Sequence, residues 1–191
     1  MRIALFGGTF DPVHNAHLII AREAAERFQL DEVHLIPSGN PPHKAVGPTT
    51  DFVHRFEMVR LACEGQPHLC ASRLEEGTAR SYSIHTIERV KQQLCATDEL
   101  FFLIGGDAFA EIGTWYRSAD VIRAVDFIVA SRPGYQYPIP SGARVLRLES
   151  VALPVSSSEI RFRLEVGDLP EELPARVLAY IRHNGLYGAT E

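Results

Sequence analysis

Two histidines, His14 and His17, lie three residues apart and follow a pair of glycines near the start of the chain. The segment reads LFGGTFDPVHNAH over residues 5–17. Paired glycines after an apolar run let the backbone turn tightly and bring amide N–H groups close to a bound group. A helix that begins at Asn15 adds free N–H groups and a positive dipole end there, with both imidazoles on one side of its first turn. The segment therefore predicts a binding site for an anion such as phosphate.

Other interpretations of this segment are less favoured. It does not fit the P-loop pattern, and it lacks the third glycine of a dinucleotide-binding fingerprint. The histidines could ligate a metal ion, but no third histidine or carboxylate stands at a spacing typical of zinc sites, so we predict no metal-binding residue. A single histidine would be interpreted as an ordinary helix-start residue, whereas two beside Gly7 and Gly8 favour the phosphate site.

A second segment with phosphate-binding chemistry lies late in the chain. Three consecutive serines, Ser156, Ser157 and Ser158, are followed by Arg161 one helical turn later. Hydroxyls at a helix start and a guanidinium one turn in can both hold phosphate oxygens. Serines in this position could also act only as helix caps. Because each segment opens a predicted helix after a strand, the two together are stronger evidence for phosphate binding than either segment alone.

Short apolar runs alternate with amphipathic segments and indicate the elements that position these residues. Strands are predicted at residues 3–6, 33–37, 69–74, 100–104, 126–130 and 145–148. Helices are predicted near 15–29, 52–63, 83–94, 158–166 and 171–184, with Thr50 or Asp51 and Ser83 as caps and Gly185 as a stop. This order predicts an α/β fold, a Rossmann-like parallel sheet with helices on both faces. We expect one domain over residues 1–191, a loop over 38–50, and ligands at the carboxyl ends of the strands.

The composition narrows the class of protein. The 19 Lys and Arg residues against 24 Asp and Glu give a net charge of −5, which argues against nucleic-acid binding. The three cysteines contain no C-x-x-C pair, so they offer neither a disulfide framework nor a zinc ligand set. No apolar run is long enough to span a membrane, and the start of the chain leads directly into a strand pattern. These features predict a cytoplasmic protein without membrane or nucleic-acid partners.

Residues 8–17 resemble the G-x-F-x-P-x-H-x-G-H signature of the adenylyltransferases related to class I aminoacyl-tRNA synthetases. Residues 156–161 are similar to the second signature of that family, S-[ST]-[ST]-x-x-R. Members transfer AMP from ATP to a phosphorylated acceptor and release pyrophosphate. The resemblance implies a nucleotidyltransferase-type fold, with His14, His17 and Arg161 as the catalytic residues. One departure is Ala16, which stands where the family has a glycine that lies against the adenine ring.

The same resemblance implies an ATP site and its metal ion. The residues expected to bind ATP are Gly7, Gly8, Thr9, Phe10, His14, His17, Gly105, Asp107, Ser156, Ser157, Ser158 and Arg161. Mg²⁺ is expected with ATP, held mainly by substrate oxygens and water, as is usual for that ion.

Four further segments, residues 36–44, 81–86, 102–107 and 115–117, resemble the nicotinate-nucleotide adenylyltransferases, and the likeness runs to the closing YIRHNGLY. This implies that nicotinate mononucleotide is the acceptor and nicotinate adenine dinucleotide (deamido-NAD) the product, a step of NAD biosynthesis. The residues expected to bind the acceptor are Ser38, Asn40, Lys44, Thr86, Trp115, Tyr116 and Arg132. In the family, the backbone N–H groups at Thr86 and Tyr116 hold the nicotinate carboxylate, and Trp115 stacks on the pyridine ring. His85 is a departure, because the family usually has aspartate there.

Three alternatives stay open at this point. The chain could act on nicotinamide mononucleotide or on phosphopantetheine, as other members of the superfamily do. It could also be a nucleotide-binding regulator that has the fold without the activity. Trp115 could be a packed aromatic that only covers the sheet edge. The expected partners are ATP and nicotinate mononucleotide, and the sequence allows a homo-oligomer without indicating one.

Overall fold

A six-stranded, wholly parallel sheet forms the centre of the computed structural model, which describes residues 1–40, 50–78, 80–150 and 155–189. The strands are β1 (Arg2–Gly8), β2 (Glu32–Pro37), β3 (Leu69–Ala71), β4 (Glu99–Gly105), β5 (Asp126–Ser131) and β6 (Val145–Glu149). Their order in the sheet is β3-β2-β1-β4-β5-β6. The chain therefore runs outward from β1 in both directions, and the carboxyl ends of β1 and β4 meet where the order reverses. A parallel sheet binds its ligands at such a point.

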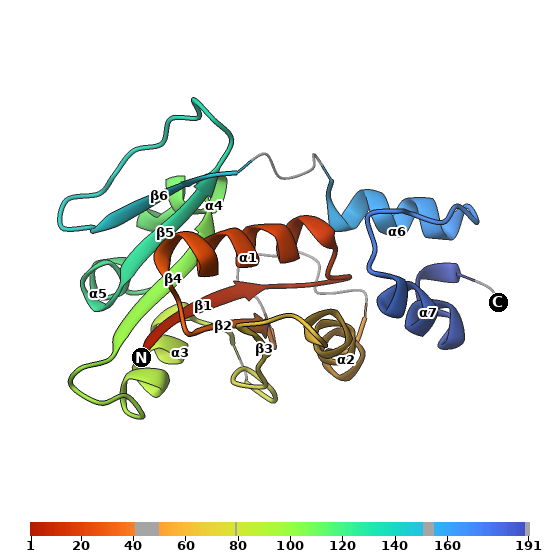
Figure 1. The fold of residues 1–191 in the computed structure, drawn as a ribbon, viewed down its shortest axis with the longest axis horizontal. Helices are drawn as coiled ribbons and strands as arrows, with labels where there is room; N and C mark the ends of the chain where they lie inside the picture. Colours follow the sequence, from red (N-terminus) through yellow and green to blue (C-terminus); the bar gives the residue numbers. More distant parts are fainter. Residues whose placement is uncertain (41–49, 79, 151–154, 190–191) are drawn as a thin grey trace.

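Helices follow the strands along the chain and cover both faces of the sheet (Figure 1). They are α1 (Asn15–Phe28), α2 (Phe52–Cys63), α3 (Ser83–Lys91), α4 (Gly106–Ala110), α5 (Ser118–Ala124), α6 (Ser157–Glu165) and α7 (Ala175–His183). Two 3₁₀ turns, Ile112–Thr114 and Leu186–Gly188, complete the described elements. In Figure 1, α6 and α7 lie on the side toward which β1 points, so they stand at the carboxyl ends of the strands.

Each face of the sheet has its own hydrophobic core. Alternate residues of a strand point to opposite faces, so Phe101 and Leu103 belong to one core, and Phe102 and Ile104 to the other. The first core also contains side chains from α1, α2, α6 and α7, and the second contains side chains from α3, α4 and α5. This explains why the strands read as unbroken apolar runs. The predicted parallel α/β fold with helices on both faces is confirmed.

Several predicted boundaries differ from the structure. The strand predicted over residues 69–74 ends at Ala71, and the last helix begins at Ala175 because Pro174 occupies its N-cap position. Helix α3 begins at Ser83 itself, with Tyr82 at the N-cap, so the prediction that Ser83 caps it is wrong. Helices α4 and α5 have 5 and 7 residues, too few to show a helical period. Gly185 follows α7 with φ of 60°, as a left-handed helix stop requires.

Within the described residues, no helix combines the length and apolar character that crossing a membrane requires. Cys63, Cys70 and Cys95 are all free thiols.

Candidate active site

The loop after β1 is shaped by one aromatic side chain. Phe10 is buried at 2% exposure, has φ of 50°, and packs edge-on against Phe6 with ring centroids 5.7 Å apart. A Cβ atom on Gly8 would lie 2.9 Å from Cζ of the Phe10 ring, closer than real Cβ atoms approach. Because the Phe10 ring is buried and has little room to move away, glycine is favoured at position 8.

Buried polar side chains hold this loop in place. Arg55 of α2 is 1% exposed, and its Nη1 donates to the carbonyl oxygen of Thr9 at 2.9 Å while its Nε donates to Thr50 at 3.0 Å. The Tyr187 hydroxyl donates to Asp11 Oδ1 at 2.6 Å. Burial, helped by this bond, raises the pKa of Tyr187 well above its ordinary value, so the phenol stays neutral. These contacts from α2 and from the 3₁₀ turn Leu186–Gly188 hold the loop in place.

The two phosphate-binding segments touch each other although most of the chain separates them. Arg161 Nη1 donates to the carbonyl oxygen of Asp11 at 2.7 Å, and the Ser157 hydroxyl donates to that of Pro12 at 3.0 Å. Arg161 Nη2 also reaches the Ser158 hydroxyl at 3.3 Å. A guanidinium has five N–H groups, so these two contacts leave further donors for a ligand. The sequence segments therefore form one composite surface rich in N–H and O–H groups.

Ser156 is the N-cap of α6, and its hydroxyl accepts a hydrogen bond from the Glu159 N–H at 3.1 Å. The capping interpretation of the serines thus describes Ser156 correctly. It does not exclude a phosphate site, because a helix start has further N–H groups that can bind an anion, and Ser157 in this first turn contacts the loop after β1.

The imidazole rings of His14 and His17 stack with centroids 3.7 Å apart and planes tilted by 28°. His17 Nδ1 accepts a hydrogen bond from the His14 backbone N–H at 3.2 Å, which leaves the ring proton of His17 on Nε2. His14 Nδ1 is buried without a hydrogen-bond partner in the described residues. Unpaired polar atoms of this kind are rare in a core and are more common at binding sites.

Burial keeps both rings neutral. It lowers the pKa of His14 to about 4 and that of His17 well below 6.5, with the His14 ring adding to the shift at His17. At neutral pH the pair therefore offers N–H donors, not two positive charges.

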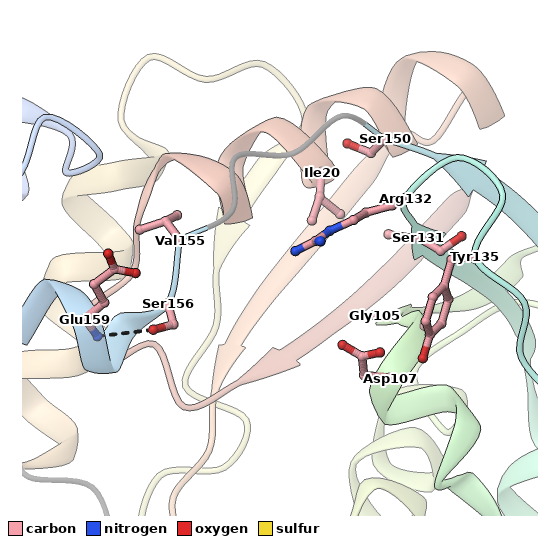
Figure 2. A pocket seen from close by; sticks show the side chains of 12 residues that line it. Ile20, Gly105, Asp107, Ser131, Arg132, Tyr135, Ser150, Val155, Ser156 and Glu159 are labelled. Carbon is pink, nitrogen blue, oxygen red and sulfur yellow. Dashed lines mark hydrogen bonds between the residues drawn. The ribbon is translucent and has the colours of Figure 1, made fainter.

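One cavity of about 510 Å³ opens at the carboxyl ends of β4 and β5 (Figure 2). Its lining consists of Ile20, Gly105, Gly106, Asp107, Ala130, Ser131, Arg132, Tyr135, Ser150, Val155, Ser156 and Glu159. Figure 2 shows the Arg132 side chain extending from the end of β5 into the cavity, with Asp107 and Tyr135 on one side and Ser156 on the other. We call this the first cavity.

A second cavity of about 240 Å³ lies between β1, β2, β4 and the start of α3. Its lining includes Gly7, Gly8 and Thr9 at the end of β1, the polar residues Ser38, Glu75 and Thr86, and the aromatic residues Tyr82, Trp115 and Tyr116. Gly105, the last residue of β4, lines both cavities. Two ligands could therefore lie side by side across the end of that strand.

Known proteins resemble this chain over nearly its whole length. Residues 5–163 match the cytidylyltransferase-like family. A protein of Solibacter usitatus (strain Ellin6076) named "Probable nicotinate-nucleotide adenylyltransferase" is 55% identical over 187 residues, which cover 98% of this chain and 100% of that protein. The chain belongs to the nicotinate-nucleotide adenylyltransferase family. A relative of the same name from Exiguobacterium sibiricum is 41% identical over 87% of this chain and 88% of its own length.

Solved structures share the fold of this chain. The Plasmodium falciparum nicotinic acid mononucleotide adenylyltransferase complexed with NaAD superimposes with a TM-score of 0.77 at 18% identity, covering 98% of this chain and 97% of that one. The same enzyme complexed with APC gives a TM-score of 0.76. At this identity the likeness concerns the fold alone, and it agrees with the sheet order described above.

The structure brings most of the residues expected for this family to the two cavities. Gly105, Asp107 and Ser156 line the first cavity, and Ser38, Thr86, Trp115 and Tyr116 line the second together with Gly7, Gly8 and Thr9. Asn40 lies beside the second cavity, where its N–H donates to the Ser81 hydroxyl at 3.0 Å. Lys44 lies outside the described residues. Trp115 packs edge-on against Phe102, with centroids 6.0 Å apart, while it also lines the cavity.

Two expectations for the acceptor residues stay predictions. Arg132 lines the first cavity, because β4 lies between β5 and the second cavity. The backbone N–H of Thr86, expected to hold a carboxylate, donates to the Tyr82 carbonyl oxygen at 3.4 Å within the first turn of α3. That bond is long, so the N–H is weakly occupied in this structure.

The sequence interpretation also missed residues that support the site. Glu75 is 8% exposed, and its Oε1 accepts a hydrogen bond from the Thr86 hydroxyl at 2.7 Å in the second cavity. No sequence signal separates this glutamate from a solvated loop residue. Arg55 could have been noticed, because it lies on the apolar face of α2 beside Phe56 and Val59. Tyr82 stacks near Tyr116, with centroids 4.4 Å apart.

Proposed function

We propose that the protein transfers AMP from ATP to nicotinate mononucleotide, and that deamido-NAD and pyrophosphate are the products. The observation that carries the proposal is the position of the two hydrogen-bonded phosphate segments beside two cavities that share Gly105. ATP would occupy the first cavity, and the acceptor would occupy the second. The names of the relatives support the choice of substrates.

In this proposal the acceptor phosphate attacks the α-phosphorus of ATP in line, a new P–O bond forms, and the bond to pyrophosphate breaks. The attacking phosphate is already an anion, so no side chain has to act as nucleophile or base. The chain positions two substrates and stabilises charge that develops at the α-phosphate. Neutral His14 and His17 would donate N–H bonds there, while Arg161 and the first turn of α6 would hold the departing phosphates.

The first cavity would hold the adenosine part of ATP. Asp107 stands at the start of α4, where its carboxylate can accept a hydrogen bond from a ribose hydroxyl. A Cβ atom on Gly105 would meet nothing within 4 Å, so the strand end leaves room for a ligand. Arg132 would contribute positive charge beside the nucleotide, a role on the ATP side of the site and not the acceptor side.

The second cavity would hold the pyridine nucleotide. Aromatic rings of Trp115 and Tyr116 suit a flat, positively charged ring, an interaction worth about 0.5–2 kcal/mol. The start of α3 opens into the same cavity at Ser83, and the positive end of a helix favours an anionic group such as the nicotinate carboxylate. A carboxylate only accepts hydrogen bonds, so backbone N–H groups there suit it better than they suit a carboxamide.

Mg²⁺ would accompany ATP and neutralise charge on the triphosphate. The described residues that line the first cavity offer the carboxylates of Asp107 and Glu159 and a few serine hydroxyls. They include no set of three carboxylate, histidine or cysteine ligands close enough to hold an ion by themselves. Such residues fit an ion whose ligands come mainly from substrate oxygens and water.

A turnover assay tests the proposal. The full chain is incubated with ATP, Mg²⁺ and nicotinate mononucleotide, and pyrophosphate and dinucleotide are measured together. We expect one pyrophosphate for each deamido-NAD, and no release without the acceptor or with phosphopantetheine in its place. ATP binding without pyrophosphate release would instead identify a nucleotide-binding regulator and would overturn the proposal.

A further inference from the structure

Strands β2 and β3 bring three metal-ligating side chains together away from both cavities. Glu32 and His34 are two residues apart on β2, so their side chains point to the same face of the sheet. Cys70 on β3 is the register partner of His34, so its side chain points to that face as well. The three possible ligand atoms lie within 4.8 Å of one another. Within residues 1–40, 50–78, 80–150 and 155–189, this is the one such group of three.

The group already has the contacts of a preformed site. His34 Nε2 and Glu32 Oε2 share a hydrogen at 2.6 Å, and the two side chains are 26% and 37% exposed. Cys70 is a free thiol of intermediate burial. All three are therefore held by the sheet on one side and can be reached from solvent on the other. None of them lines the first or the second cavity.

We propose that Glu32, His34 and Cys70 bind a borderline-soft divalent transition-metal ion such as Zn²⁺, with water as a fourth ligand. Imidazole nitrogen, thiolate sulfur and carboxylate oxygen are the ligands that Zn²⁺ takes, whereas Mg²⁺ and Ca²⁺ take oxygen. Bond lengths to zinc are about 2.0–2.2 Å for nitrogen and oxygen and about 2.3 Å for sulfur. The ligand atoms, which lie within 4.8 Å of one another, belong to side chains that are partly exposed and can turn toward an ion.

Metal binding replaces bonds that the three side chains make in the metal-free protein. The Cys70 thiol loses its proton to solvent and forms a metal–sulfur bond. The proton shared between His34 Nε2 and Glu32 Oε2 moves through solvent to His34 Nδ1, so that the ring stays neutral, and the two freed atoms form the metal–nitrogen and metal–oxygen bonds. The ion then links β2 to β3, a three-residue strand at the edge of the sheet. Residues soon after β3 reach Glu75 at the second cavity, so the ion would stabilise the segment that carries one wall of that cavity. The site takes no part in adenylyl transfer, and the inference is independent of the proposed function.

Cobalt(II) provides the direct test, because it substitutes for zinc and absorbs light. The metal-free full chain is titrated with Co²⁺ under a non-chelating reductant, in the absence of nucleotide. We expect a near-ultraviolet band from a Co²⁺–thiolate bond and visible bands typical of four ligands. Added Zn²⁺ should displace the cobalt and raise the melting temperature, as a ligand specific to the folded state does.

Variants assign the signal to residues. Cys70→Ser should abolish the near-ultraviolet band, His34→Gln should weaken Co²⁺ binding at least about tenfold, and both should retain adenylyl transfer. Cys95→Ser is the matched control, because Cys95 is an exposed thiol outside the group of three, and it should leave the titration unchanged. Absence of the thiolate band in the parent, its persistence in Cys70→Ser, or its loss on replacing the His14–His17 pair would each overturn the proposal.

Discussion

Gly39 makes the tightest glycine contact of the described chain, and replacing it by alanine should damage the acceptor site. A Cβ atom at this position would lie 2.2 Å from the carbonyl oxygen of Glu75 and 2.7 Å from the Thr78 hydroxyl. Atoms on real side chains do not approach below about 3.0 Å, so the two segments must separate by roughly 0.8 Å. The obstacle is backbone, which cannot rotate away as a side chain does.

The loss of stability in Gly39→Ala follows from moving these two segments apart. Forcing an extra methyl group into a packed position costs about 1–3 kcal/mol. For a chain of this length that corresponds to a melting temperature lower by about 2–12 °C. The moving segment carries Glu75, whose carboxylate holds the Thr86 hydroxyl in the second cavity. We therefore expect Gly39→Ala to raise KM for nicotinate mononucleotide while the Kd of ATP stays near that of the parent.

Gly113→Ala is the matched control, because a Cβ atom there meets nothing within 4 Å. Such a change is neutral or stabilises by up to about 1 kcal/mol. Thermal unfolding and steady-state kinetics of both variants are compared with the parent. If Gly39→Ala melts within 1 °C of the parent and binds the acceptor equally well, the contact between Gly39 and Glu75 is not as described, and this reasoning fails.

Three further predictions concern the phosphate segments. His17→Ala should lower kcat by about 10²–10³-fold with little change in ATP binding, because the Nε2–H bond of His17 strengthens as charge builds on the α-phosphate. A rate constant within threefold of the parent's in single-turnover assays would contradict this. Arg161→Lys loses the forked donor geometry and should weaken ATP binding in a calorimetric titration, with acceptor affinity nearly unchanged; the reverse pattern would move Arg161 to the acceptor side. Because burial lowers the pKa of His14 to about 4, the unfolded chain binds its proton first and stability falls as pH falls from 6.5 to 4. Relative to His14→Asn, the parent should lose about 3 kcal/mol more over that window in urea unfolding, and equal losses would refute the assignment.

The sequence predicts the sheet well because parallel strands buried on both faces stand out as apolar runs, as residues 100–104 do. It also predicts a site at His14, His17 and Arg161, because their chemistry is local to two short segments. The bond from Arg161 to Asp11 could not be predicted, since it joins residues 150 positions apart. Helices α4 and α5 are too short for their period to show.

Arg132 illustrates what the sequence leaves undetermined. Its position directly after a strand predicts that it lies at the carboxyl edge of the sheet, but which of the two cavities it lines depends on strand order. The order β1-β4-β5 places the end of β5 on the far side of β4 from the second cavity. Residue spacing along the chain does not contain this information, because several strand orders share the same sequence of elements.

The choice of acceptor is tested most directly by comparing nicotinate mononucleotide with nicotinamide mononucleotide. The two differ only in a carboxylate and a carboxamide, and a site built from N–H donors leaves the carboxamide NH₂ facing a donor. When such a mismatch is fully buried, it can lower kcat/KM for the wrong acceptor by about 10⁴-fold. Because Tyr116 is partly exposed, we expect a smaller ratio here. In pyrophosphate-release assays we predict kcat/KM at least about 10²-fold higher for the acid. Equal efficiency for the two acceptors would contradict the assigned substrate, and the absence of release with either would contradict adenylyl transfer itself.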